Sequence, residues 1–433
     1  MHGPSQTESA QGDASCERRP WERICVVGLG YVGLPTAAVL ASTRRHVVGV
    51  DIDPSRVAII NDGSAPIAEP DLSSKVRDAV ATGRLQAQTT AAPADAFIIA
   101  VPTPLKGGHE PDLRHLRAAA SAVARVLVPN NLVVLESTSP VGTTEAFCDW
   151  LAAARPDLSF PHLAGAASDI RVAYSPERVL PGAIVRELVE NDRIIGGVTP
   201  ECGEAARSLF MQFVHGECSV TNARTAELVK LTENAHRDVN IAFANEIALV
   251  CDAHGVDPWE LIELANRHPR VNVLQPGPGV GGHCIAVDPW FLVHSARELT
   301  PIIQAARHVN DRRPDWVVDR VEAACRGIAR PAIACLGLAY KADVGDLRES
   351  PAIEIVEKLR ARIAGRIVVV EPHIDNLPAE LADDRIDLVD LDEALQVATI
   401  AVLLTDHREF LEIDPGCLRG KRLVDTRGAW RGF

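Results

Sequence analysis

The chain has 433 residues, a length that suggests about two to four domains. Its 44 lysines and arginines against 58 aspartates and glutamates give a net charge of −14, which argues against a nucleic-acid backbone or an anionic membrane as the main partner. With 47% hydrophobic and 24% charged residues, the composition is that of a globular protein with a large core. Any phosphate that it binds must therefore meet local positive charge.

The sequence predicts a cytoplasmic protein with reduced thiols. No run of 18 apolar residues could cross a bilayer, and the polar first 20 residues lack the apolar stretch of a secretory signal. The ten cysteines include no CxxC pair, so neither a disulfide framework nor a metal site is expected. We expect nine of them to be small buried side chains or to lie in the N-terminal segment, and one, Cys284, to be reactive.

The first part of the chain has the rhythm of a parallel α/β sheet. Residues 1–20 carry no apolar periodicity and are expected to form a flexible tail. From Ile24 onward, short β-branched runs alternate with helical stretches: ICVVG, HVVGVDID, AFIIAVPTP and LVVLESTSP. We predict one α/β domain over residues 21–218.

A long helix is predicted from about Ala223 to Ala253, because apolar residues recur there at spacings of three, four and eight. These residues are Leu228, Leu231, Val239, Ala242 and Phe243. The helix is too long for a small sheet domain and should connect two lobes, as part of a helical central domain over residues 219–315.

The β rhythm returns after Pro331 with AIACLG, GRIVVVEP and TIAVLLTDH, which predicts a C-terminal α/β domain over residues 316–433. The predicted fold is therefore α/β, with two Rossmann-like parallel-sheet lobes joined by a long central helix and a helical middle domain. In both lobes the successive predicted strands end in the same order of residues. The first ends in Gly-Leu, the next in an acid (Asp51 or Glu371), and the third in Pro102 or Thr405. This order suggests an internal duplication. The second lobe lacks a full GxGxxG, so we expect it to bind something other than a second dinucleotide.

A glycine motif follows the first strand and opens a helix, which is the context that a dinucleotide fingerprint requires. Gly28, Gly30 and Gly33 permit a tight turn and let a pyrophosphate approach the helix N-terminus. Asp51 lies 21 residues after Gly30, where a carboxylate would accept hydrogen bonds from a ribose diol and repel a 2′-phosphate. NAD is therefore favoured over NADP, although Arg56 is of the type that can serve a 2′-phosphate.

The segment PGPGVGGHC at residues 276–284 cannot form a helix or an interior strand, so Cys284 is expected on a loop that can approach a ligand closely. On the long helix, Lys230 and Asn234 are four residues apart and Arg237 follows one turn later. A solvated face could explain these three side chains, but a helix between two lobes has less reason to be solvated. A lysine there can take or return the proton of a reacting hydroxyl, while the adjacent amide fixes its position.

These motifs together predict a four-electron oxidation. One hydride transfer takes an alcohol to an aldehyde and requires only a base and a nicotinamide. A thiolate that adds to the aldehyde gives a thiohemiacetal, which can lose a second hydride to form a thioester, and water then releases an acid. A dinucleotide motif, a loop cysteine and a helix lysine therefore predict oxidation of a primary alcohol to a carboxylate.

The segments GLGYVGLP, VPTP, STSPVGTT, SPERVLPG, ELVKLTEN, PGPGVGGHC and LGLAYKADVGDLRESPA resemble the UDP-glucose/GDP-mannose dehydrogenase family of nucleotide-sugar 6-dehydrogenases from about residue 23 onward. Within that family, GGHCIAVDPWF and HPRVNVLQPGPG resemble the UDP-N-acetyl-D-mannosamine enzymes. The UDP-glucose enzymes more typically carry Lys where this chain has Val287, and the UDP-N-acetylglucosamine enzymes Pro where it has Ala286.

The resemblance implies specific roles. Cys284 would be the nucleophile and Lys230 the proton donor and acceptor that also stabilises the oxyanion, while Asp288 would orient the lysine or water and Glu177 would assist thioester hydrolysis. NAD would contact Tyr31, Val32, Asp51, Arg56, Thr103, Thr138 and Arg348. A UDP-sugar would contact Arg178, Val179, Lys230, Asn234, Arg237, His268, Arg270, Gly281, Tyr340 and Lys341.

The resemblance also accounts for charge and assembly. Four cations would neutralise the diphosphate in this acidic protein: Arg178, Arg237, Arg270 and Lys341. In this family Arg270 would come from a second subunit, which implies a homodimer built on the long helix. The implied reaction is the oxidation of UDP-N-acetyl-D-mannosamine at C6 for surface polysaccharide precursors.

Several alternatives stay open. UDP-N-acetylglucosamine or UDP-glucose could be the substrate. A two-electron β-hydroxyacid dehydrogenase can also pair a Rossmann lobe with a Lys-x-x-x-Asn helix, but it needs no thiol loop. Outside the enzymes, the chain could be an NAD-sensing scaffold.

Overall fold

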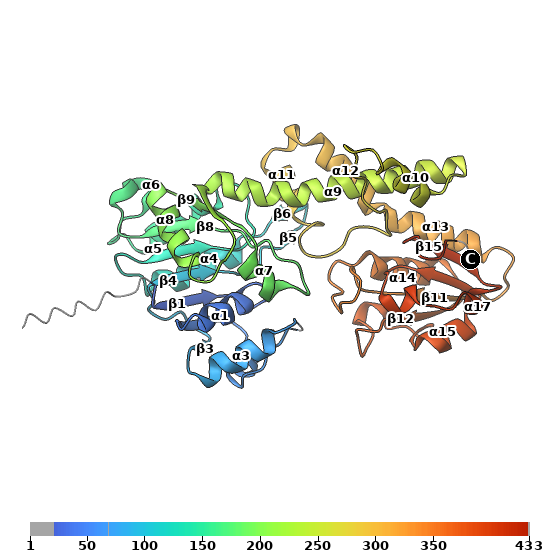
Figure 1. Cartoon of the computed structure of the whole chain (residues 1–433), viewed down its shortest axis with the longest axis horizontal. Helices are drawn as coiled ribbons and strands as arrows, with labels where there is room; N and C mark the ends of the chain where they lie inside the picture. The colour runs from blue at the N-terminus through green and yellow to red at the C-terminus, as the bar shows by residue number, and fades with distance from the viewer. Residues whose placement is uncertain (1–20, 68, 432–433) are drawn as a thin grey trace, which may run out of the picture. The chain divides into compact units, whose positions relative to one another are not determined.

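The computed structural model describes residues 21–67 and 69–431 (Figure 1). The predicted tail, residues 1–20, lies outside the described residues. The contacts divide the chain into two compact units. The first comprises the residues up to 102, 115–137 and 144–223, and the second comprises 103–114, 138–143 and 224–433. The long central helix thus groups with the C-terminal sheet, and the predicted domain boundaries at 218 and 315 stay a prediction.

The first unit is built on an eight-stranded sheet with the order β10-β9-β8-β7-β4-β1-β2-β3. Its strands are β1 (Arg23–Val27), β2 (His46–Val50), β3 (Leu85–Gln88), β4 (Ala96–Ile99), β7 (Leu132–Leu135), β8 (Arg171–Tyr174), β9 (Arg193–Gly197) and β10 (Cys218–Asn222). The four predicted runs match β1, β2, β4 and β7, and their polar ends, such as ESTSP, form loops at the carboxyl edge of the sheet. The predicted parallel α/β fold is confirmed.

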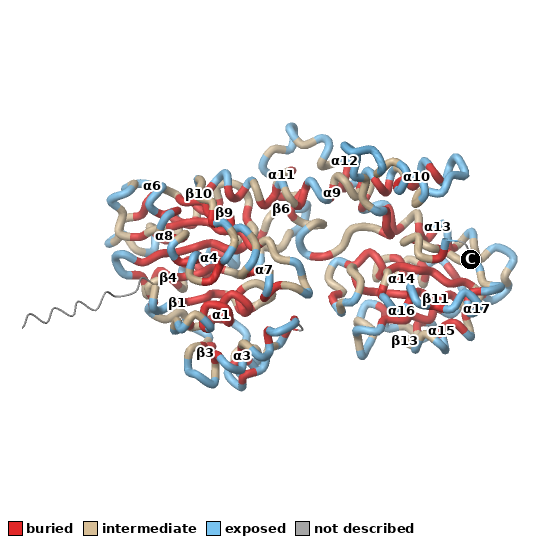
Figure 2. Tube along the Cα trace, viewed as in Figure 1, coloured by how far each residue is buried: buried red, intermediate tan, exposed pale blue. Residues whose placement is uncertain are grey.

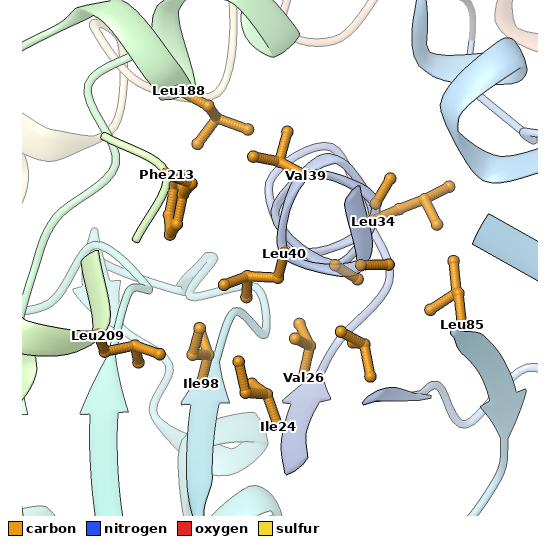
Figure 3. Packing of buried hydrophobic residues seen from close by; sticks show 14 of the residues in the cluster. Ile24, Val26, Leu34, Val39, Leu40, Leu85, Ile98, Leu188, Leu209 and Phe213 are labelled. Atoms are coloured by element: carbon orange, nitrogen blue, oxygen red, sulfur yellow. The ribbon is translucent and has the colours of Figure 1, made fainter. Parts of the chain in front are cut away.

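Helices cover this sheet and complete its core. They are α1 (Gly33–Ser42), α2 (Pro54–Asn61), α3 (Leu72–Ala81), α4 (Arg114–Ala124), α5 (Thr143–Ala154), α6 (Pro161–Ala164), α7 (Ile184–Glu190) and α8 (Pro200–Phe210), with a 3₁₀ turn at Gly165–Ala167. Figure 3 shows Leu40 of α1 facing Ile98 and Val26 of the sheet, and Val39 on the other side of the helix beside Leu188. Nine of the ten residues of α1 are buried, because Ala and Leu fill almost every turn.

One pair of neighbouring strands departs from the parallel pattern. β8 and β9 are antiparallel, with Tyr174 opposite Gly196, whereas every other pair in this sheet is parallel. The chain leaves β8 at the carboxyl edge of the sheet and enters β9 at that same edge, after the short helix α7. Extending this register by three residues sets Glu177 opposite Arg193, so the reversal brings a basic side chain to the edge where ligands of such sheets bind.

The second unit begins with helices. They are α9 (Ala223–His254), α10 (Pro258–Ala265), α11 (Asp288–Ser295), α12 (Pro301–Asp311) and α13 (Arg313–Cys325), with a 3₁₀ turn at Arg297–Leu299. A short hairpin, β5 (Leu105–Lys106) and β6 (Glu110–Pro111), joins them, with His109 stacked on Trp290 at 3.9 Å. The predicted long helix is thus confirmed as α9, with 32 residues. Two of its predicted apolar residues, Leu228 and Phe243, are 45% and 50% exposed.

A five-stranded parallel sheet with the order β13-β12-β11-β14-β15 forms the rest of the second unit. Its elements are β11 (Ala332–Leu336), α14 (Pro351–Arg362), β12 (Arg366–Val370), the 3₁₀ turn Ala379–Leu381, β13 (Ile386–Leu388), α15 (Leu391–Val397), β14 (Ile400–Leu403), α16 (Arg408–Leu411), α17 (Pro415–Leu418) and β15 (Arg422–Asp425). Figure 2 shows the strands of both sheets buried beneath more exposed helices.

The two sheets share a local geometry that agrees with an internal duplication. Gly28 after β1 and Gly337 after β11 both have φ +95°, and their N–H groups donate to the last residue of the neighbouring strand, Val50 and Val370, at 2.7 and 2.9 Å. The acids Asp51 and Glu371 follow those neighbouring strands and accept the N–H groups of the glycine turns.

Two further observations bear on the sequence predictions. Across residues 21–67 and 69–431, none of the helices has both the length and the apolar character needed to span a bilayer. Six of the eight described cysteines other than Cys284 are buried as expected, but Cys417 is exposed and Cys325 is half-buried. Cys417 lies in the four-residue helix α17 at the surface, where the expectation of burial was wrong. Cys16 lies outside the described residues.

Candidate active site

The glycine turn after β1 leaves room for a ligand at the start of α1. A Cβ atom on Gly33 would lie 1.8 Å from the Gly28 carbonyl oxygen, so this position admits only glycine where α1 packs on the turn. A Cβ on Gly30 would meet no atom within 4 Å. Tyr31 and Val32 complete the turn before α1. The open space at Gly30, beside the helix N-terminus, fits the approach of a pyrophosphate.

Asp51 lies at the carboxyl end of β2 and is 8% exposed. Its carboxylate accepts the N–H groups of Leu29 and Asp53, both at 3.0 Å, and forms an ion pair with Arg56 at 3.2 Å. Because Arg56 is bound to this carboxylate, a 2′-phosphate that approached the arginine would also meet the negative charge of Asp51. The residues of this turn therefore fit NAD.

Cys284 lies on the predicted loop, just before α11. Its carbonyl oxygen accepts the N–H groups of Val287 and Asp288 at 3.1 and 2.8 Å, which fixes the turn into the helix. A Cβ on Gly281 would lie 2.7 Å from the Cβ of Tyr340, and the Gly282 N–H donates to the Arg348 carbonyl at 3.1 Å. The glycines thus let the loop lie directly against the segment after β11. Three predicted ligand residues, Gly281, Tyr340 and Arg348, therefore come together near Cys284.

Lys230, Asn234 and Asp288 form a buried polar cluster beside this loop, with exposures of 7%, 9% and 2%. The Asn234 Nδ2 donates to Asp288 Oδ2 at 2.5 Å. Burial raises the pKa of Asp288 to about 6, against the opposing effects of the Lys230 charge and the Asn234 hydrogen bond. The amide of Asn234 thus orients Asp288, and its expected contact with a substrate hydroxyl stays a prediction.

Cys284 is an exposed residue. Desolvation by the surrounding atoms raises its pKa, and the Asp288 carboxylate adds to this effect, while Lys230 and Arg348 act in the opposite direction. The thiol therefore needs a proton acceptor before it can act as a nucleophile near neutral pH. The side chain of Arg348 is held by Asp346 through two hydrogen bonds of 2.8 and 2.6 Å.

The remaining predicted residues of the second unit are distributed around the loop and the helices. The Thr103 hydroxyl donates to the Thr138 carbonyl at 2.6 Å, so these two predicted cofactor residues are in contact. Lys341 is half-buried directly after Tyr340. Three predicted substrate residues are exposed on α9 and on the segment after α10: Arg237, His268 and Arg270.

Glu177 lies in the first unit, within a buried charge cluster that the sequence did not reveal. Arg193 donates to Glu136 at 3.0 Å and to Glu177 at 2.8 Å, and all three side chains are at most 8% exposed. The other Glu177 oxygen accepts the Arg178 N–H at 2.6 Å, and Val179 packs against the core. Burial raises the pKa of Glu136 to about 7, although the Arg193 charge opposes this. The sequence signal that could have indicated this cluster is Glu136, an acid that directly follows the apolar run LVVL.

Three residues of the second unit are of the types that bind metals, but the ring nitrogens of one of them, His407, are already hydrogen-bonded. Asp343, His373 and His407 offer ligand atoms within 4.8 Å of one another. The His407 Nδ1 accepts the Asp343 N–H at 2.9 Å, and its Nε2 lies 3.1 Å from Glu371 Oε2. Both ring nitrogens are thus engaged in hydrogen bonds, and His407 has no lone pair left for a metal.

Three domain profiles of the UDP-glucose/GDP-mannose dehydrogenase family match the chain: the NAD binding domain at residues 22–214, the central domain at 224–312 and the UDP binding domain at 334–432. The NDP-N-acetyl-D-galactosaminuronic acid dehydrogenase of Ralstonia nicotianae is 60% identical, over 94% of this chain and 96% of that protein. The UDP-N-acetyl-D-mannosamine dehydrogenase of Yersinia pestis is 54% identical, over 95% and 100%. The solved UDP-D-ManNAc dehydrogenase of Pyrococcus horikoshii has a TM-score of 0.86 and 39% identity, over 95% and 96%.

Proposed function

Because the chain belongs to the UDP-glucose/GDP-mannose dehydrogenase family, we propose that it oxidises UDP-N-acetyl-D-mannosamine at C6 to UDP-N-acetyl-D-mannosaminuronic acid. The observation that carries this proposal is the exposed residue Cys284 beside the buried cluster of Lys230, Asn234 and Asp288. The proposal places the enzyme in the cytoplasm, in the synthesis of surface polysaccharide precursors.

The reaction removes four electrons in two steps. NAD supplies the electron acceptor, since each molecule takes up one hydride. The C6 hydroxyl first loses a proton and a hydride to become an aldehyde. The Cys284 thiolate then adds to the aldehyde carbon, and loss of a second hydride converts the thiohemiacetal into a thioester. Water displaces the thiol and leaves the carboxylate. The balance is one alcohol, one water and two NAD to one carboxylate, two NADH and three protons.

The buried cluster supplies the proton chemistry of these steps. Lys230 takes the hydroxyl proton and, once charged, stabilises the oxyanion of the thiohemiacetal. The resemblance assigns to Asp288 the orientation of Lys230 or water, and Asn234 fixes this carboxylate by its 2.5 Å hydrogen bond. The family resemblance assigns to Glu177, which forms an ion pair with Arg193, the activation of the water that hydrolyses the thioester. This assignment follows the roles that the family resemblance implies.

The sugar is the finer part of the proposal. The relatives from Ralstonia nicotianae and Yersinia pestis carry two names, NDP-N-acetyl-D-galactosaminuronic acid dehydrogenase and UDP-N-acetyl-D-mannosamine dehydrogenase. Because the Ralstonia nicotianae protein is 60% identical to this chain, UDP-N-acetylgalactosamine is the second candidate substrate. Both sugars present the same primary alcohol at C6, so the thiol chemistry is common to both.

We further propose a homodimer built on α9 and α10. These helices expose Leu228, Phe243, Val250 and Leu264, each at least 45% accessible. A row of such side chains favours burial against a second copy. The exposed Arg270 would then reach the diphosphate of the partner's substrate, as the resemblance implies.

The test is a count of NADH per sugar. The purified protein is incubated with limiting UDP-N-acetylmannosamine, UDP-N-acetylgalactosamine, UDP-N-acetylglucosamine or UDP-glucose and excess NAD, and NADH is read at its absorption maximum. We expect two NADH per UDP-N-acetylmannosamine. A ratio near one would indicate a two-electron dehydrogenase, and no NADH with any sugar would support the scaffold alternative. Cys284→Ser should lower uronate formation by at least about a thousandfold.

A further inference from the structure

Five polar side chains lie along one side of α9 and are almost fully buried. Their exposed fractions are 0% for Glu227, 7% for Lys230, 9% for Asn234, 0% for Asp238 and 0% for Asn245. The intervals between them are three, four, four and seven residues, which places all five on one face of a helix. We call this face the polar stripe. Buried polar groups require hydrogen-bond partners, so the stripe must be matched by other segments.

The stripe fastens the catalytic loop at both of its ends. The Asn245 Oδ1 accepts the N–H of Gly277, where the loop begins, at 2.9 Å. The Asn234 Nδ2 donates to Asp288, where the loop ends, at 2.5 Å. The two asparagines are eleven residues apart, which is three helical turns and about 16 Å along the axis. The nucleophile Cys284 lies between these two fixed points.

A buried network sets the orientation of the Asn245 amide. Its Nδ2 donates to Asn310 Oδ1 at 2.9 Å, and Asn310 Nδ2 donates to Asp238 Oδ1 at 2.8 Å. Arg307 binds the same Asp238 oxygen at 2.6 Å, with both side chains at most 3% exposed. Because Asn310 presents its oxygen to Asn245, the Asn245 amide nitrogen faces Asn310 and its oxygen faces Gly277. Arg313 completes the anchor, since its Nε donates to the Gly277 carbonyl at 2.9 Å.

We propose that Asn245 is a positioning residue for Cys284, acting through Gly277, and that Asn310 and Asp238 hold its amide in the required orientation. The proton-transferring Lys230 lies on the same stripe, so one rigid helix sets the position of the nucleophile relative to the base. This inference rests on the proposed function, because it assigns the loop cysteine as the nucleophile.

The experiment compares Asn245→Ala with the matched control Asn240→Ala. Asn240 is on the same helix, outside the stripe, and its Nδ2 donates to the backbone carbonyl of His236 at 2.7 Å and lies 3.3 Å from the Nε2 of the same residue. Turnover is measured with saturating UDP-sugar and NAD and expressed per NAD-binding site, with the NAD dissociation constant and the melting temperature measured in parallel. We expect Asn245→Ala to lower kcat by about 100-fold with the NAD constant unchanged within about twofold, since misplacing a reacting group by about 1 Å has an effect of this size. Asn240→Ala should keep the wild-type kcat.

A second readout follows the loop itself. The rate at which iodoacetamide alkylates Cys284, resolved from the other cysteines by peptide mass spectrometry, should change in Asn245→Ala and stay constant in Asn240→Ala. If Asn245→Ala does not fold, Asn310→Ala carries the test, because it removes the group that orients the amide without touching Gly277. It should lower kcat by about tenfold.

A wild-type kcat per NAD-binding site in Asn245→Ala or Asn310→Ala, even with a lower melting temperature, would show that the stripe is only structural and would overturn the inference. Failure of the proposed function has a different signature, since the wild-type protein itself would then form no NADH from any UDP-sugar.

Discussion

Replacing Glu136 by glutamine should stabilise the first unit at alkaline pH and have little effect at acid pH. Glu136 is 1% exposed, and it shares the Arg193 guanidinium with Glu177. Burial raises its pKa from the ordinary 4.5 to about 7, and the Glu177 charge adds to the rise while Arg193 opposes it. The folded chain therefore keeps this proton to a higher pH than the unfolded chain does.

The sign and size of the effect follow from linkage. Between pH 4.5 and about 7, unfolding releases the Glu136 proton, so the free energy of unfolding falls as the pH rises through that window and stays lower above it. The difference between the two pKa values corresponds to about 3 kcal/mol, at about 1.4 kcal/mol for each pKa unit. For a unit of about 200 residues this amounts to about 6–12 °C in melting temperature. Glutamine carries no charge at either pH and escapes this loss.

The assay is thermal unfolding of the wild type and Glu136→Gln at pH 5 and pH 8. We expect nearly equal melting temperatures at pH 5 and a higher value for the variant at pH 8. Glu190→Gln is the matched control, because that carboxylate is 63% exposed in its pair with Arg186 and should show no such pH dependence. If the difference between wild type and Glu136→Gln is the same at both pH values, Glu136 does not hold a proton in the fold and the reasoning is wrong.

Other predictions concern the two units separately. Gly33→Ala should lower the melting temperature and abolish NAD binding, because its Cβ would lie 1.8 Å from the Gly28 oxygen. Gly30→Ala, whose Cβ would meet no atom within 4 Å, should fold normally and weaken NAD binding by about tenfold or more. Calorimetric titration with NAD distinguishes these two outcomes. Burial raises the pKa of Asp288 to about 6, so activity should fall as the pH drops through about 6, when the carboxylate proposed to orient Lys230 is protonated. Asp288→Asn should remove this acid limb from the pH profile of kcat. An acid limb that persists in Asp288→Asn would assign it to another group.

The sequence predicted those parts of the fold and site that local patterns determine. The strands β1, β2, β4, β7, β11, β12 and β14 and the helix α9 follow from β-branched runs and helical periodicity. The exposed position of Cys284 follows from a segment whose prolines and glycines exclude regular structure. These features depend on neighbours in sequence, and a single chain is enough to recognise them.

Contacts between distant segments could not be predicted in the same way. Glu136 and Arg193 are 57 residues apart, and they meet only because β9 runs antiparallel to β8, a reversal that the path of a short connection decides. The role of Asn245 depends on a hydrogen bond to a backbone amide 32 residues further on. Its spacing from Asn234 was nevertheless visible, since two asparagines eleven residues apart lie on the same face of a helix.

The glycine turns of the two sheets are alike, but the acids that they hold lie in different surroundings. In the second sheet, Glu371 Oε2 accepts the N–H groups of Leu338 and Ala339 at 2.7 and 2.9 Å and also meets the His407 ring at 3.1 Å, and the carboxylate side chain is fully enclosed. In the first sheet, the equivalent Asp51 remains 9% exposed beside a half-open arginine. The His407 ring thus occupies the side of Glu371 on which a ribose could otherwise bind, and this acid serves to hold the turn together. The same turn geometry thus encloses an acid completely in one sheet, while in the other sheet it presents a carboxylate that solvent still reaches.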